Sequence, residues 1–134
     1  MKKTLFLVLV CLFGNFVGFA QTTRYKGTLV TESYTQKDVV VQVVENNNKA
    51  NGTIYKAKVS RAIPMKFDLD IKGLSRLVQD DKVYISGNNL TPYLENKAMD
   101  KYKLMHFNAV KSGDTFQFKT FLGKKKISYE GKKI

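Results

Sequence analysis

The stretch that decides the fold is MKFDLDIK, residues 65–72, in which apolar and charged side chains alternate at every position. Its apolar residues all have odd numbers and its charged residues all have even numbers. Successive side chains of a β-strand point to opposite faces of the sheet, so this pattern predicts a strand with one face in a core and the other in water. No window after Arg24 carries an apolar stripe at helical spacing. We therefore predict an all-β protein.

Seven further segments with strand character are separated by turn residues. The predicted strands cover residues 24–34, 38–45, 52–59, 82–86, 101–110, 115–122 and 126–133. Residues 74–78 fit either a strand or a short helical turn. Residues 90–100 have no clear period and are predicted to form a long loop or lid.

Eight short strands in succession leave two exposed sheet edges unless the sheet closes on itself. The triplets Tyr25-Lys26-Gly27 and Tyr129-Glu130-Gly131, near the two ends of the chain, share a Tyr-x-Gly pattern. Pairing of the first and last strands would place a glycine of each where the sheet bends, with the tyrosine covering it. We predict one domain over residues 21–134, an eight-stranded antiparallel up-and-down barrel. A two-sheet β-sandwich remains the alternative.

Residues 1–20 carry the pattern of a secretory signal peptide. Lys2 and Lys3 precede an apolar run at residues 5–12, and Gly18 and Ala20 place small residues before a cut at residue 21. We predict secretion across an inner membrane, to the periplasm or out of the cell. No later apolar run approaches the roughly 20 residues that span a bilayer.

Attachment of a lipid at Cys11 is the less favoured alternative. Such a site needs a small residue just before the cysteine, and Val10 stands there. Because Cys11 is the single cysteine and falls in the predicted signal, the remaining chain can form neither a disulfide nor a thiolate metal site.

The residue types needed for catalysis are sparse. His106 is the single histidine, which leaves no multi-histidine metal site and no obvious catalytic triad. Asp68 and Asp70 alternate with apolar residues and are flanked by lysines, so they fit a solvated strand face better than a cation site or a glycosidase pair. We predict a non-enzymatic protein with no catalytic residue, no metal and no cofactor.

Positive charge concentrates toward the C-terminus. The chain has 23 Lys and Arg against 11 Asp and Glu, a formal net charge of +12. Residues 101–134 hold nine lysines against Asp114 and Glu130, and Lys124, Lys125 and Lys126 fall at one predicted turn. This patch is predicted to attract an acidic envelope glycan or partner protein. Lysines that guard sheet edges would give the same pattern. Secretion argues against nucleic acid as the normal partner.

Four short stretches resemble a known family. YKGTL at residues 25–29, IPMKFDLDI at 63–71, YISGNNLTP at 84–92 and YEGK at 129–132 resemble the calycin-like family of small secreted bacterial proteins. The resemblance implies a lipocalin-like eight-stranded barrel, and it carries over no catalytic or binding residue. The chain has no tryptophan and so lacks the Gly-x-Trp signature of true lipocalins.

The barrel interior is the predicted ligand site. An eight-stranded barrel is wide enough either to fill with side chains or to hold one small ligand. We predict a small apolar or amphipathic ligand at the barrel mouth, lined by Tyr55, Phe67, Leu69, Tyr84, Leu104, Phe116 and Phe118. The alternative is a filled barrel that acts as an interaction module, with Lys124, Lys125 and Lys126 docking on an anionic envelope component or partner protein.

Overall fold

A computed structural model describes residues 20–32, 34–58 and 66–134 of the chain. The predicted signal peptide lies outside the described residues except for Ala20. The last residue of the predicted strand 52–59 and the first residue of the predicted strand 65–72 also lie outside them.

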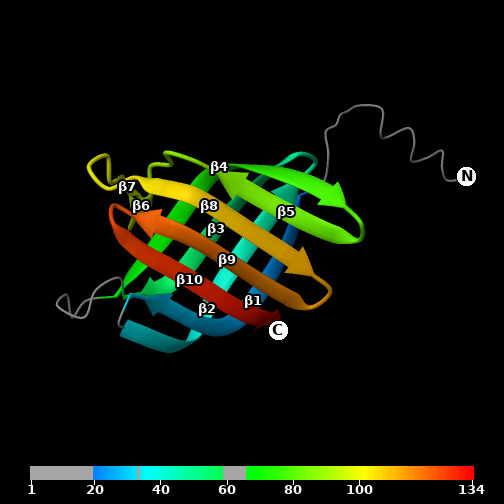
Figure 1. Ribbon diagram of the computed structural model, residues 1–134, viewed down its shortest axis with the longest axis horizontal. Helices are drawn as coiled ribbons and strands as arrows, with labels where there is room; N and C mark the ends of the chain where they lie inside the picture. The colour runs from blue at the N-terminus through cyan, green and yellow to red at the C-terminus, as the bar shows by residue number, and fades with distance from the viewer. Residues whose placement is uncertain (1–19, 33, 59–65) are drawn as a thin grey trace, which may run out of the picture.

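Every regular element in the described residues is a strand, so the all-β prediction is confirmed (Figure 1). The strands are β1 (Gln21–Thr31), β2 (Tyr34–Asn46), β3 (Lys49–Ala57), β4 (Phe67–Gln79), β5 (Lys82–Gly87), β6 (Tyr93–Leu94), β7 (Lys97–Ala98), β8 (Leu104–Ser112), β9 (Thr115–Leu122) and β10 (Lys125–Lys133). Residues 74–78 belong to β4. The predicted loop at residues 90–100 contains the small β6–β7 hairpin, which pairs with β4.

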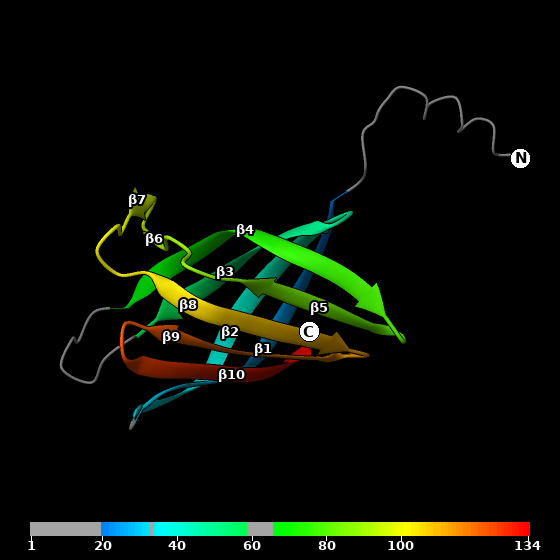
Figure 2. The same cartoon turned by 45° about the horizontal axis from the view of Figure 1, so that its top comes forward.

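The eight longer strands form a closed antiparallel barrel, as predicted. Their order is β3-β2-β1-β10-β9-β8-β5-β4, and pairing of β3 with β4 closes the ring (Figures 1 and 2). Each strand of the ring pairs with the strand of the ring that follows it along the chain, and β10, the last strand, pairs with β1, the first. Short turns join β1 to β2, β2 to β3, β4 to β5, β8 to β9 and β9 to β10, whereas residues 88–103 join β5 to β8. Closure satisfies the edges that an open sheet would expose.

The seam between the first and last strands forms around paired glycines. Gly27 lies directly opposite Gly131 in the antiparallel pairing of β1 with β10. A Cβ added to Gly27 would collide with the backbone of Glu130 and Gly131, and one added to Gly131 would collide with the Tyr129 phenol. The tyrosine therefore covers the glycine two residues after it, and the two backbones approach more closely than larger residues would allow.

Aromatic rings fill the centre of the barrel. Tyr25 stacks on Phe116 with ring centroids 4.9 Å apart, and Phe118 stacks on both Phe107 and Tyr129 at 5.0 and 5.4 Å. The Tyr129 hydroxyl donates a hydrogen bond of 2.9 Å to the carbonyl of Val39 on β2. These contacts join strands that are adjacent or next but one around the ring, from β8 through β9, β10 and β1 to β2, so the aromatic side chains form one stacked cluster on that side of the core.

Two residues predicted to face the interior point outward. In β5 the interior position is taken by the buried Ile85, and Tyr84 is 38% exposed on the outer face. Both are large and apolar, so alternation alone does not decide between them. In β3 a bulge at Lys56, where φ is 54°, shifts the register and turns both Ile54 and Ala57 inward. Tyr55 is therefore half-buried outside the barrel.

Candidate functional site

The barrel has two ends with different character. The turns β2–β3, β4–β5 and β8–β9 lie at the end on the right of Figure 1. The turns β1–β2 and β9–β10 and the segment 88–103 lie at the other end, on the left. Figure 2 shows the same separation of the turns. We call the right-hand end the ion-pair end and the left-hand end the basic end, after the side chains described below.

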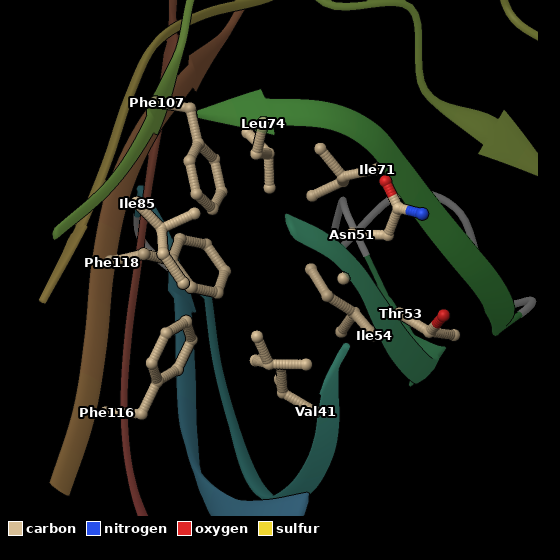
Figure 3. A pocket seen from close by; sticks show the side chains of 12 residues that line it. Val41, Asn51, Thr53, Ile54, Ile71, Leu74, Ile85, Phe107, Phe116 and Phe118 are labelled. Atoms are coloured by element: carbon tan, nitrogen blue, oxygen red, sulfur yellow. The ribbon is translucent and has the colours of Figure 1, made fainter. Parts of the chain in front are cut away.

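The interior between the two ends has almost no free volume. Its cavity measures about 10 Å³, close to the volume that one water molecule needs. Figure 3 shows the rings of Phe107, Phe116 and Phe118 reaching from one wall toward Val41 and Ile54 on the other. Side chains would have to move before a small ligand could enter.

The seven residues predicted to line a ligand site are not brought together. Phe116 and Phe118 are buried and line the small cavity. Leu69 and Leu104 are also buried but belong to other parts of the core. Phe67 is half-buried at the start of β4, and Tyr55 and Tyr84 lie on the outer surface, as described above.

The ion-pair end is closed by a buried carboxylate that the sequence analysis did not single out. Glu45 on β2 is 2% exposed, and its two carboxylate oxygens accept hydrogen bonds of 2.7 Å from Arg76 Nε on β4 and Lys111 Nζ on β8. Arg76 also donates to the carbonyl of Asn47 at 2.7 Å. The burial of Glu45 could have been predicted from the sequence, because this residue continues the inward, odd-numbered face of the valine run in β2.

The charges at this end set the ionisation of Glu45. Burial disfavours its carboxylate, but hydrogen bonds and positive charge from Lys111 and Arg76 outweigh burial and hold its pKa below the usual 4.5. Burial also raises the pKa of Tyr25 to about 12, and the negative charge of Glu45 adds to this effect. The cluster therefore holds an ionised carboxylate between two cations, beside a neutral phenol.

At the basic end, lysines from two neighbouring segments come together. Leu104 pairs with Leu122 in the β8–β9 ladder, so residues 101–103 lie beside the turn between β9 and β10. We define the basic end by Lys101, Tyr102, Lys103, Phe121, Lys124, Lys125 and Lys126. All except the half-buried Lys103 are exposed.

Large aromatic side chains are exposed among these lysines. Phe121 is 38% exposed, pairs directly with Lys126 across the β9–β10 ladder and has Met105 on its other side. Tyr102 is 55% exposed. Among the described residues both ion pairs involve Glu45, so the lysines of the basic end lie outside them. Glu32, whose backbone N–H donates to the Lys126 carbonyl, and Asp100 are acidic residues nearby.

The remaining candidates from the sequence make structural hydrogen bonds or lie on the surface. Asp70 accepts a hydrogen bond of 2.7 Å from the Thr53 hydroxyl, and Asp68 accepts one of 3.0 Å from the backbone of the bulged Lys56. His106 is exposed in a bulge of β8 with φ of 52°. Within the part of the chain that the structure describes, no group of three or more metal-binding side chains is gathered.

A second hollow lies on the outer face of β1, β9 and β10. Its volume is about 250 Å³, and small side chains such as Thr28, Val30 and Ser128 form its floor between Lys119 and Glu130. Glu130 faces Gln117 across the ladder and Ser128 faces Lys119, so polar side chains at paired positions of β9 and β10 contribute to this outer depression. No residue of the basic end lines it.

Comparison with known proteins identifies no relative: no protein-family model, curated protein or solved structure matches the chain. Among the residues described, no helix is long and apolar enough to span a membrane.

Proposed function

We propose that this protein is a non-enzymatic interaction module, a barrel filled by its own side chains that binds an anionic partner through the basic end. The observation that carries the proposal is the cluster of exposed lysines on two adjacent segments, outside the ion pairs that the described residues form. Lysines that point into solvent from neighbouring turns act together on one partner, and their field weakens as salt screens it.

A small ligand in the barrel remains a prediction with less support. The residues predicted to line its site are scattered between core and surface, and the interior cavity is about the size of one water molecule. The filled core instead supports a protein whose partner meets the outer surface. We retain the calycin-like resemblance as part of the proposal, because the closed eight-stranded barrel agrees with the fold that it implies.

We also propose that the protein acts outside the cytoplasm, because residues 1–20 carry the signal-peptide pattern. The intact mass of the protein isolated from its own cells tests this. A chain that begins at Gln21 is the expected result. A mass that includes residues 1–20 would refute secretion by cleavage, and a lipid on Cys11 would support the alternative.

A polyanion column tests the basic end. The probe is immobilised heparin, and the variant is the triple substitution Lys124→Gln, Lys125→Gln and Lys126→Gln. The matched control is Lys49→Gln, Lys132→Gln and Lys133→Gln, which removes three exposed charges at the opposite end. Net charge falls equally in both, so net charge alone predicts equal elution.

We expect the wild type and the control to elute at similar salt, and the basic-end variant to elute at clearly lower salt. Equal weakening of both variants would overturn the proposal, because it would show attraction by net charge without a defined site. Passage of the wild type through the column at low salt would also overturn it.

A further inference from the structure

We infer that the partner of the basic end is an anionic lipid bilayer, with Phe121 and Tyr102 entering the headgroup region while the surrounding lysines contact the lipid phosphates. The inference rests on the proposed function and adds the class of partner. Three observations carry it: the exposed aromatic side chains, the position of these segments at one end of the barrel, and the contrast with the exposed apolar residues elsewhere.

The aromatic side chains are unusual for a patch that serves charge alone. Phe121 and Tyr102 are 38% and 55% exposed, although a phenylalanine gains from leaving water. Phe121 lies between Lys126 and Met105 on the outer face, so the apolar group is bordered by a cation. Apolar or aromatic residues combined with lysines are the composition by which proteins bind the surface of an anionic membrane.

The shape of the basic end favours a flat partner over a linear polymer. The β9–β10 turn and residues 101–103 lie at one extremity of the barrel in both views (Figures 1 and 2). Extended polymers are held in grooves that follow their backbone. The interior cavity and the outer depression are both lined entirely by residues outside the basic end. Lysines and aromatics exposed on two neighbouring segments at the end of the barrel can instead touch a plane at several points at once.

Exposed apolar side chains on the β4–β5 hairpin, at the opposite end, lie beside negative charge. Leu77, Val78 and Tyr84 are exposed on the β4–β5 hairpin, where the turn is formed by Asp80 and Asp81. An anionic bilayer would repel those carboxylates. Both ends therefore expose apolar groups, but those of the β4–β5 hairpin lie beside two carboxylates, whereas Phe121 pairs directly with a lysine.

Vesicle binding separates the lipid contact from simple attraction to negative charge. The probes are vesicles of phosphatidylcholine alone, vesicles of phosphatidylcholine with phosphatidylglycerol, and immobilised heparin. The aromatic variant is Tyr102→Ser with Phe121→Ser, and its matched control is Leu77→Ser with Tyr84→Ser at the other end. All four residues are exposed, and circular dichroism and urea unfolding check that each variant folds.

We expect the wild type to bind the anionic vesicles and not the neutral ones. The aromatic variant is expected to lose at least about fivefold in affinity for anionic vesicles, because only the exposed 38% of Phe121 remains to be buried, while its elution from heparin stays unchanged. The control variant is expected to bind vesicles like the wild type. The lysine variant described above is expected to weaken on both probes.

A fluorescence measurement gives an independent readout. The chain contains no tryptophan, so Phe121→Trp creates a single reporter at the basic end and Tyr84→Trp creates one on the outer face of β5. Anionic vesicles are expected to shift the emission of the first to shorter wavelength and to leave the second unchanged. An unchanged emission from Phe121→Trp in the presence of bound vesicles would overturn insertion.

The outcomes distinguish this inference from the function on which it rests. Binding to heparin without binding to anionic vesicles would overturn the lipid inference and leave an anionic polymer or protein as the partner. Vesicle binding that the aromatic variant fully retains would limit the contact to lysines and also overturn insertion. Binding to neither probe would overturn both the inference and the proposed function.

Discussion

The two ends of the barrel both depend on charged side chains, with opposite consequences. At the ion-pair end one buried carboxylate holds Arg76 and Lys111, whose side chains are only 19% and 17% exposed. At the basic end Lys124, Lys125 and Lys126 project into solvent. Buried charges need partners within the protein, whereas exposed lysines are already solvated and stay available to other molecules. The comparison therefore separates charge that stabilises the fold from charge that is free to bind.

The largest effect on stability is expected from a substitution in the seam between β1 and β10, which runs from one end of the barrel to the other. Gly27→Ala should lower the free energy of unfolding by about 3 kcal/mol or more, because its Cβ would overlap the backbone of Glu130 and Gly131. Urea unfolding measures the change. Gly52→Ala is the control, since the nearest heavy atom to its Cβ would be 3.8 Å away. Equal, small losses in both variants would mean that the seam is not tightly packed.

The next effect is confined to the ion-pair end. Glu45→Gln should destabilise the protein by about 2 to 3 kcal/mol, because two cations would face each other without their carboxylate. This value lies just below the range of about 3 to 5 kcal/mol for broken buried pairs, because both cations retain some access to water. Glu130→Gln, which removes an exposed carboxylate, should change stability by less than about 0.5 kcal/mol. Similar losses in the two variants would contradict a special role for Glu45.

The pH dependence of stability should also distinguish the ends. The pKa of Glu45 is lower in the folded protein than its usual 4.5, so the unfolded chain binds its proton more readily. Its contribution is present above about pH 4.5 and is lost as the pH falls through the folded pKa. Urea unfolding between pH 6 and pH 3 should show a steeper loss for the wild type than for Glu45→Gln. Parallel curves would show that Glu45 does not cause the acid sensitivity.

The smallest effect on stability is expected at the basic end. Replacing Lys124, Lys125 and Lys126 together by glutamine should change the free energy of unfolding by no more than about 0.5 kcal/mol, because the side chains are exposed and lie outside the ion pairs described. Urea unfolding beside the heparin measurement tests both properties in one variant. A loss above about 1 kcal/mol would assign these lysines to the fold and not to a partner.

Local alternation predicts most of the strands but fails where a bulge intervenes. In β4 the odd-numbered residues Leu69 and Ile71 are buried as expected, and then Gly73, with φ of 75°, shifts the pattern so that the even-numbered Leu74 faces inward. In β3 the bulge at Lys56 has the same effect on Tyr55. One added residue reverses every later side chain, and the period-2 pattern does not show where it is inserted.

The two charged clusters differ in how far their residues are separated along the chain. Lys124, Lys125 and Lys126 are consecutive, so their shared turn could be predicted directly from the residues. Glu45 meets Arg76 and Lys111 from 31 and 66 residues away, because β2, β4 and β8 face one another around the closed ring. Between bulges, the alternation of residues along the chain determines which side chains share one face of a strand. The order and register of strands around the barrel follow from packing of the whole core, and these alone place a carboxylate between two distant cations.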